Sequence, residues 1–497
     1  MKKVAFLLLG LLVIYSCSKE NPDEIVDGNA EILDAQKLLS VKEVNQFIEN
    51  ELKTTGDVNW TEAPANVLWS ATVHGGEVLS IGYGEEGQSF AVQKSAELLN
   101  AKENIFSIIA TLENTKKQDM VVSDDDILNV IDTRVTSLET IETLQKTEKV
   151  RYLEPIGYNL YLEPVAEKSK LGCDQNGANV NSNDYRVISP NSWLPWNFDI
   201  HKITEAWNYS TGAGITVGLI DTGLSTGQNL LGSSFNDGFS SGRSVQRFGT
   251  YIDSPWWWSN NVDGPNDRCG HGTSMAAAIA APRNNDFMPV GVAYNCNLVS
   301  YRGTADVVLN DYHERKGVSN ALKALGNRGD VKVISMSIGY PWSIGNVKDA
   351  VRYAYSRGKM LIAAGGTSTS FTNWYGVIFP ASMSETVAVT GIKDNGYNRC
   401  DICHDGNKID FTIVMQRAGN SSRNVPVLGF NGGQRDYVSG SSVATAMTAG
   451  IAALVWSRNP NMSRNQVLEK LKRSGEFYPN RSSKFGYGNI NALKAVQ

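Results

Sequence analysis

Residues 439–446 read Ser-Gly-Ser-Ser-Val-Ala-Thr-Ala, and the run 447–454 of small and apolar residues follows directly. A turn of small residues therefore delivers one serine, Ser442, to the start of a long predicted helix. The N-terminus of a helix carries unpaired backbone N–H groups and partial positive charge, which favour negative charge nearby. Ser442 is a candidate nucleophile, provided that another residue can take its proton.

Two upstream residues are suited to activating this serine. A serine hydroxyl attacks only when a base accepts its proton, and the base is usually a histidine oriented by a buried carboxylate. Of the five histidines, only His271 lies among small residues at the head of a predicted helix, between Gly270 and Gly272. Asp221 ends an apolar strand predicted at 215–220, and open α/β sheets place their sites at the carboxyl ends of parallel strands.

The stretches 221–223 (Asp-Thr-Gly), 271–273 (His-Gly-Thr) and 440–444 (Gly-Ser-Ser-Val-Ala) resemble the three motif blocks of subtilisin-like (S8) serine proteases. Their order is the one that this family uses. The stretch 485–491 resembles the family's closing segment, so the resemblance covers about residues 193–497. It implies an α/β fold with a central, mostly parallel sheet flanked by helices. It also implies hydrolysis of peptide bonds by Asp221, His271 and Ser442.

One departure from the family concerns the oxyanion. The family's oxyanion asparagine follows an Ala-Ala-Gly-like stretch, and here residues 363–365 are followed by Gly366, which has no side chain to donate a hydrogen bond. Losing one such donor typically lowers the rate about 10²–10³-fold. Three alternatives stay open: Asn373 or another donor replaces the asparagine, the enzyme is slow, or the domain is a degenerate protease used for binding.

The resemblance also places the substrate pocket. Ser337, Ile338 and Gly339 match one wall, residues 363–365 match the other, and Ile378 lies at the base, where the family often has glycine. Bulk at Ile378 predicts a shallow pocket that favours small side chains.

The N-terminal residues predict export. Two lysines and a short apolar run lead to residues 14–17, Ile-Tyr-Ser-Cys, which resemble the lipobox of bacterial lipoprotein signal peptides. This resemblance implies cleavage after residue 16, a lipid on Cys17, a tether over 17–34 and an extracytoplasmic, membrane-anchored protein at the outer membrane or cell surface. An ordinary secretory signal with an incidental cysteine is the alternative.

Residues 35–165 are expected to form a separate α+β domain. We predict a helix over 35–52, a hairpin within 67–83, a helix over 89–100 and a strand over 104–113. The strand–helix–strand pattern of 128–155 resembles the last half of a subtilisin-like propeptide, which implies an intramolecular inhibitor and chaperone; a generic α+β domain is the alternative. The polar, turn-rich stretch 166–189 suits a processing linker, and 190–497 is the expected peptidase domain.

The composition of the chain bears on which classes of molecule it binds. The 497 residues carry a net charge of −5, which gives no support for nucleic-acid binding and leaves protein or peptide substrates. No cofactor is required and no metal ligand cluster is readable, although the family often has structural calcium. Cys400 and Cys403 favour a local disulfide over a haem or metal motif, and Cys269 either pairs with Cys296 or is a free thiol beside His271.

Two functions therefore remain. The first is an active endopeptidase made as a lipid-anchored zymogen, and the second is a catalytically impaired subtilisin-like domain that serves as a surface binding or scaffold protein. The complete set of Asp221, His271 and Ser442 favours the first, and Gly366 favours the second. The aromatic stretch 255–258, Pro-Trp-Trp-Trp, either grips substrate or is a surface loop packed onto the domain.

Overall fold

The computed structural model describes residues 37–88, 90, 94–160, 172–367 and 376–497. Residues from Leu38 to Gln497 form one compact unit, which contains a large parallel sheet and a smaller antiparallel one.

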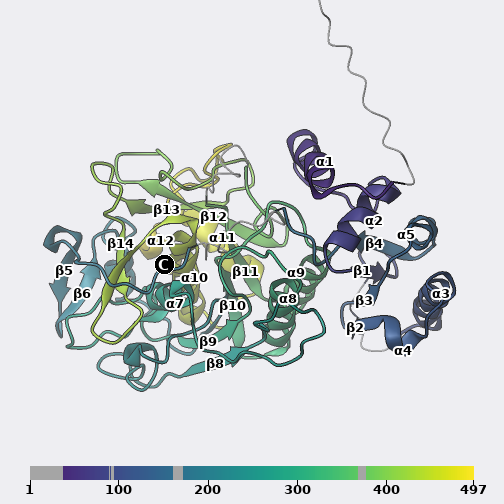
Figure 1. Cartoon of the computed structure of the whole chain (residues 1–497). Coiled ribbons are helices and arrows are strands. Elements are labelled where there is room, and N and C mark those ends of the chain that lie inside the picture. The colour runs from purple at the N-terminus through teal and green to yellow at the C-terminus, as the bar shows by residue number, and fades with distance from the viewer. Residues whose placement is uncertain (1–36, 89, 91–93, 161–171, 368–375) are drawn as a thin grey trace, which may run out of the picture. The chain divides into compact units, whose positions relative to one another are not determined.

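The large sheet has seven strands in the order β13-β12-β11-β10-β7-β9-β8 (Figure 1). Every neighbouring pair in it runs parallel. From β7 the chain first adds β8 and β9 on one side and then returns to add β10 to β13 on the other. The carboxyl end of β7 is therefore a topological switch point, where open α/β sheets bind ligands. The strands are β7 (Thr216–Asp221), β8 (Val245–Gly249), β9 (Asn297–Arg302), β10 (Val331–Met336), β11 (Met360–Ala364), β12 (Thr386–Lys393) and β13 (Phe411–Gln416).

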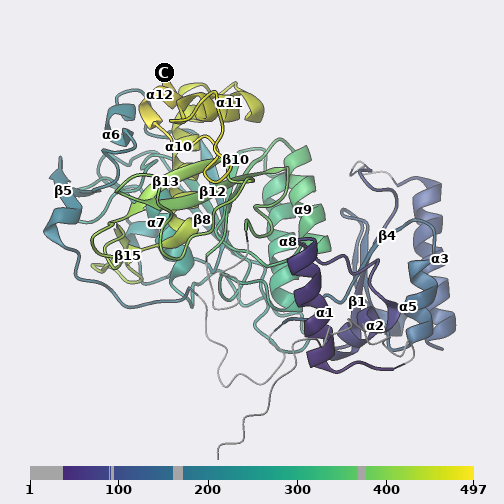
Figure 2. The ribbon, with the colours of Figure 1, turned by 90° about the horizontal axis from the view of Figure 1, so that it is seen from above.

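Helices cover both faces of this sheet, so inner strands such as β7, β11 and β12 are buried along nearly their whole length rather than at alternate residues. Helices α7 (His271–Ala280) and α10 (Gly440–Arg458) pack on one face, and α8 (Tyr312–Asn327) and α9 (Gly345–Ser356) pack on the other (Figures 1 and 2). The sheet thus separates two apolar cores. The expected α/β fold is confirmed. The strand expected at 215–220 is β7, and the helices expected at His271 and Ser442 are α7 and α10.

Shorter elements complete this part of the chain. They are β5 (Tyr185–Ile188), β6 (Ser192–Pro195), α6 (Ile203–Ala206), β14 (Val425–Leu428), β15 (Arg435–Val438), α11 (Arg464–Ser474), α12 (Ala492–Val496) and the 3₁₀ turns Ser182–Asp184 and Asn229–Leu231. Among the described residues only α10 is long and apolar enough to cross a membrane, and 94% of its most apolar window is buried inside the fold. Its composition therefore suits a core helix.

The small sheet is antiparallel, in the order β2-β3-β1-β4. Helices α3 and α5 lie side by side against it (Figure 2). The expected strand–helix–strand pattern is confirmed as β3, α5 and β4. The elements are α1 (Val41–Thr54), α2 (Ala65–His74), β1 (Val78–Tyr83), α3 (Ala96–Leu112), α4 (Lys117–Met120), β2 (Val121–Asp125), β3 (Val130–Arg134), α5 (Leu138–Gln145) and β4 (Val150–Glu154).

Two expectations for this region are wrong. The hairpin within 67–83 is a helix followed by a strand, because the glycines at 75 and 76 end α2 instead of forming a two-residue turn. The strand over 104–113 belongs to α3, whose buried Leu98, Ile105 and Ile109 lie on one helical face and whose N-cap is Ser95.

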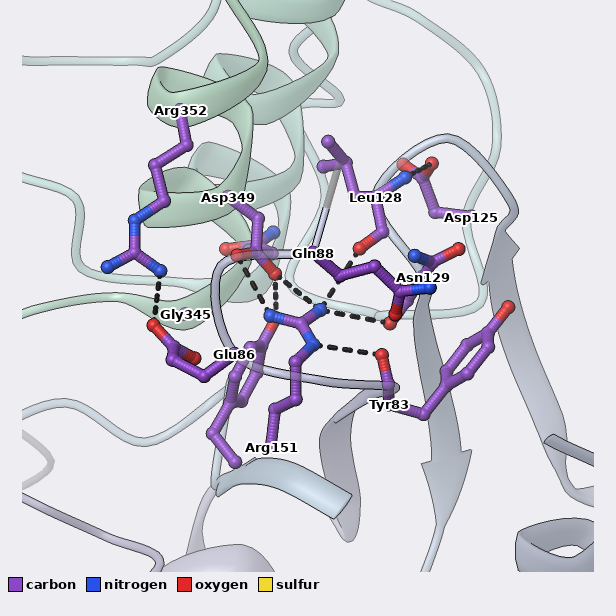
Figure 3. Close-up of polar contacts among 12 residues, drawn as sticks. Tyr83, Glu86, Gln88, Asp125, Leu128, Asn129, Arg151, Gly345, Asp349 and Arg352 are labelled. Atoms are coloured by element: carbon purple, nitrogen blue, oxygen red, sulfur yellow. Dashed lines mark hydrogen bonds and ion pairs between the residues drawn. The ribbon is translucent and has the colours of Figure 1, made fainter. Parts of the chain in front are cut away.

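The antiparallel sheet and helices α8 and α9 share an apolar core. A buried ion pair accompanies this packing. Arg151 of β4 contacts Asp349 of α9 through two hydrogen bonds of 3.0 and 2.9 Å (Figure 3). The same guanidinium donates to the carbonyl oxygens of Tyr83, Leu128 and Asn129. The small sheet and helix α9 are therefore joined by a polar contact as well as by apolar packing. This contact requires Arg151 and Asp349 to lie directly opposite each other.

Candidate active site

Asp221 and His271 meet at the switch point. Asp221 is the last residue of β7 and is fully buried, and its Oδ1 accepts a hydrogen bond of 2.8 Å from Nδ1 of His271. Burial lowers the pKa of His271, but the charge and hydrogen bond of Asp221 more than offset this, so the net pKa is raised. The contact fixes Nδ1 as the protonated nitrogen and leaves Nε2 free to accept a proton.

Asp267 holds the two motifs together, although its sequence context gave no sign of this. Its Oδ1 accepts from the backbone N–H groups of Cys269 and Gly270 and from Oγ1 of Thr222, and its Oδ2 accepts from Thr273. This buried carboxylate thus satisfies orphan N–H groups at the start of α7 and ties them to the residue after Asp221. It orients the imidazole without touching it.

Ser442 lies in the first turn of α10, with 9% of its surface exposed. Gly440 precedes it with a φ of +80°, a conformation that glycine adopts without strain and that turns the chain into the helix. Ser337 Oγ donates a 3.0 Å hydrogen bond to the carbonyl oxygen of Ser442, which fixes this turn against the end of β10.

A pocket of about 470 Å³ joins these residues. His271 and Ser442 both line it. The residues predicted to form the specificity pocket also line it: Ser337, Ile338, Gly339, Gly366 and Ile378. A β-carbon on Gly339 would lie 2.5 Å from Cδ1 of Ile378, so the isoleucine packs directly on the opposite wall. Asn373 lies outside the described residues.

The chain is similar in sequence to known proteases. A profile of the subtilase family (Peptidase_S8) matches residues 212–488. Alkaline elastase YaB of Bacillus sp. (strain YaB) is 30% identical over 308 residues, which cover 61% of this chain and 70% of that protein. M-protease of Shouchella clausii (strain KSM-K16) is 28% identical over 323 residues, which cover 63% and 73%. Thermostable alkaline protease of Halalkalibacterium halodurans is 26% identical over 375 residues, which cover 74% and 91%.

The chain belongs to the subtilase family. Together with its protease relatives, this membership identifies it as a subtilisin-like serine endopeptidase, whose substrates are proteins.

In this subtilase a histidine fills the space beside Gly366. The φ of Gly366 is +129°, and a β-carbon there would lie 2.4 Å from Nδ1 of His404. The backbone N–H of His404 donates to the carbonyl oxygen of Gly366, and its Nδ1 bonds to the carbonyl oxygen of Gly376 at 2.8 Å. The Cys400–Cys403 disulfide, confirmed here, closes the turn that presents this histidine. In the sequence, His404 is notable only because it follows Cys403. Nothing in that pattern predicts a contact between His404 and Gly366.

A second disulfide joins the expected linker, residues 166–189, to the loop before His271. Cys269 pairs with Cys173, so both sequence-based alternatives, pairing with Cys296 and a free thiol, are wrong. Cys296 is free and buried within the core beside α7. A β-carbon on Gly172 would lie 3.7 Å from Cδ2 of His271, and residues 172–174 line the pocket. We call residues 172–178 the strap.

The tryptophan loop lies elsewhere. Trp257 packs against Val78, Ile156 and Tyr312, whereas Trp256 and Trp258 stack on each other with more than half of their surface exposed. None of the three lines the pocket. The stretch 255–258 is therefore better interpreted as a surface loop packed onto the domain than as a substrate-binding loop. Within the part of the chain that the structure describes, no group of three or more His, Cys, Asp or Glu could hold a metal ion.

Proposed function

We propose that Ser442, His271 and Asp221 form the catalytic triad of this endopeptidase. The observation that carries the proposal is the Asp221–His271 hydrogen bond of 2.8 Å in a pocket that His271 shares with Ser442. Because Nδ1 donates to Asp221, Nε2 is the nitrogen that can take the proton of Ser442.

In the first step Ser442 Oγ bonds to the substrate's carbonyl carbon while its proton moves to Nε2 of His271. The imidazolium then gives this proton to the leaving amine as the peptide bond breaks, which leaves an acyl-enzyme. Water then attacks the acyl-enzyme while His271 takes its proton, and His271 returns this proton to Ser442 Oγ as the acid product leaves. The Asp221 carboxylate stabilises the imidazolium in both halves. The backbone N–H of Ser442 faces the developing oxyanion.

A fluorophosphonate probe tests this assignment on the full chain without its first sixteen residues. We expect it to label the wild type and not Ser442→Ala, and we expect peptide cleavage to disappear in the same variant. A control substitution, Ser457→Ala, removes an exposed hydroxyl near the far end of the same helix and should leave both unchanged. Labelling of the Ser442→Ala variant would refute the assignment.

For specificity, we propose a preference for small side chains at the residue before the cleaved bond. The packing of Ile378 on Gly339 supports a shallow pocket. A peptide library should show this preference in the wild type, and Ile378→Gly should extend it to larger side chains. A wild-type preference for large aromatic residues would refute the proposal.

We further propose that residues 35–165 act as a propeptide, which assists folding and inhibits the enzyme until the linker 166–189 is cut. Two observations support this. The match to the thermostable alkaline protease covers 375 residues, more than the expected peptidase domain contains, so it extends into this region. Residues 172–174 of the strap, which is part of the linker, line the pocket beside His271. The wild-type chain should shorten within the linker while Ser442→Ala stays full length; shortening of both at the same rate would exclude self-processing.

The N-terminal lipobox-like residues lie outside the described residues, and the proposal of a lipid-anchored, extracytoplasmic enzyme rests on them alone. Radiolabelled palmitate should be incorporated into the wild type and not into Cys17→Ser. Equal incorporation would refute lipidation at Cys17.

A binding or scaffold role on an impaired protease is the second candidate, and Gly366 is the observation that favours it. The two candidates separate in the fluorophosphonate experiment. An unlabelled wild-type chain that also fails to cleave peptides would support the scaffold role.

A further inference from the structure

The oxyanion side of the pocket lacks the usual donor, and the residue that fills its place cannot donate either. Nδ1 of His404 faces the carbonyl oxygen of Gly376, which can only accept, so Nδ1 carries the proton. Burial lowers the pKa of His404, which keeps the ring neutral. Its Nε2 is then an acceptor, and it is buried without a partner among the described residues. The second oxyanion donor must come from elsewhere.

Two hydroxyl groups lie on this side of the pocket. The backbone N–H of Gly366 donates to Oγ of Ser441 at 3.2 Å, and Oγ of Ser441 lies 3.3 Å from Oγ1 of Thr367. Both residues line the pocket together with Ser442. Oγ1 of Thr367 also sits over the turn that begins α10, 3.0 Å from where a β-carbon on Gly440 would be.

Among the described residues, one of the two hydroxyl protons of this pair has no acceptor. Two hydroxyl groups hold two protons, and the Ser441–Thr367 hydrogen bond uses one of them. No acceptor within the described part of the chain is recorded for the other. Of these two pocket-lining residues, Ser441 is fully buried and Thr367 is only partly buried, so Thr367 is the more accessible one to a substrate. The arrangement is a chain of donors that runs from Gly366 N–H through the hydroxyl of Ser441 to that of Thr367.

We propose that Thr367 supplies the oxyanion donor that position 366 cannot, with Ser441 as the residue that orients it. This inference rests on the proposed catalytic triad. When Ser442 Oγ bonds to the carbonyl carbon, the electron pair of the broken C=O π bond moves to the oxygen. The hydroxyl of Thr367 and the backbone N–H of Ser442 donate to that oxygen, and neither loses its proton. Donors linked in a chain strengthen one another, which suits a site that must stabilise a transient charge.

The test compares Thr367→Val with Thr367→Ser in the active enzyme. Valine keeps the shape of threonine and removes the hydroxyl, and serine keeps the hydroxyl and removes the methyl group. We expect Thr367→Val to lower kcat about 10- to 1000-fold with KM nearly unchanged, because an oxyanion donor acts in the transition state. We expect Thr367→Ser to stay within about threefold of the wild type.

A second measurement separates this role from a structural one. A peptide aldehyde forms a tetrahedral adduct with Ser442, and its inhibition constant should weaken in Thr367→Val by the same factor as kcat/KM, while binding of the product peptide stays unchanged. Ser441→Ala should lower kcat by a similar factor, and the double variant should lose little more, because both substitutions remove one donor chain.

The outcomes are distinct. A wild type that neither cleaves peptides nor reacts with fluorophosphonate overturns the proposed triad. A wild type that does both, with Thr367→Val as active as the wild type or Thr367→Ser as impaired as Thr367→Val, overturns the inference about Thr367 and leaves the triad intact.

Discussion

Replacing Arg151 with methionine should destabilise the chain by about 3–5 kcal/mol, because it leaves a buried carboxylate without its counter-charge. The side chains of Arg151 and Asp349 are only 8% and 2% exposed. Burial raises the pKa of Asp349 even with the guanidinium beside it. Without Arg151 the folded state would hold a proton there more tightly than the unfolded state does. Stability that depends on this proton is present at low pH and is lost as pH rises through the folded-state pKa. The loss should therefore be larger at pH 8 than at pH 5.

The assay is equilibrium unfolding of the full chain in guanidinium, in a Ser442→Ala background that prevents self-digestion. Tryptophan fluorescence suits it, since Trp60 and Trp342 contact each other across the shared core with ring centroids 6.3 Å apart. Arg352→Ala is the matched control. Arg352 is 27% exposed, and its partners Glu86 and Glu385 are 60% and 19% exposed, so water still reaches these charges and such pairs contribute less than about 1 kcal/mol.

A double variant completes this test. Replacing both Arg151 and Asp349 with apolar residues of similar volume should recover part of the loss, because no unpaired charge remains buried. The carbonyl oxygens that accept from Arg151 would still lack this donor, so we do not expect full recovery. If the Arg151→Met variant lost less than the Arg352→Ala control, or if its loss did not grow between pH 5 and pH 8, the reasoning from burial would be refuted.

Three further predictions concern the pocket. The kcat/KM of the wild type should rise with pH and reach half its maximum above pH 6.5, because the raised pKa keeps His271 protonated below that point and a protonated imidazole cannot act as a base. Asp221→Asn should lower kcat about 10⁴-fold and shift this midpoint to lower pH. An unshifted midpoint would contradict the assignment of Asp221. Gly366→Ala should lower the free energy of unfolding by about 1–3 kcal/mol, because alanine is strained at this φ and its β-carbon would overlap His404. Adding His404→Gly should recover part of this loss in the same unfolding measurement. Cys173→Ser opens a disulfide that spans 96 residues and should lower the same free energy by about 2–5 kcal/mol, which chemical denaturation under non-reducing conditions would show; equal stability with and without the bond would exclude a structural role.

The peptidase region was predictable because its signals are local. The strand expected at 215–220, for example, is β7, a short and fully buried run whose bounds in the structure are Thr216–Asp221. Asp221 ends such a strand, and His271 and Ser442 lie in the first turns of helices α7 and α10. Because α/β sheets place their sites at the carboxyl ends of the strands, where the following helices begin, the sequence predicted that these residues would lie close together.

The remaining features depend on contacts between residues distant in sequence. Nothing near Cys173 indicates that it lies against Cys269, and nothing near His404 indicates that its ring occupies the side-chain space of Gly366. The N-terminal errors have a different origin. Short apolar runs such as 104–113 suit a strand and a buried helix equally well, and only the packing of α3 against the small sheet decides between them.

The burial of Cys296 has a consequence for oxidative folding. Burial raises the pKa of this thiol to about 12, so at pH 7 only about one molecule in 10⁵ carries the thiolate that attacks disulfides. Once the core around Cys296 has formed, this thiol can no longer exchange with the Cys173–Cys269 bond. The choice between a correct and an incorrect partner for Cys269 is therefore made before the core closes. A Cys296→Ala variant should refold from the reduced state with fewer mispaired species, and the native enzyme should keep its disulfides unscrambled during prolonged storage.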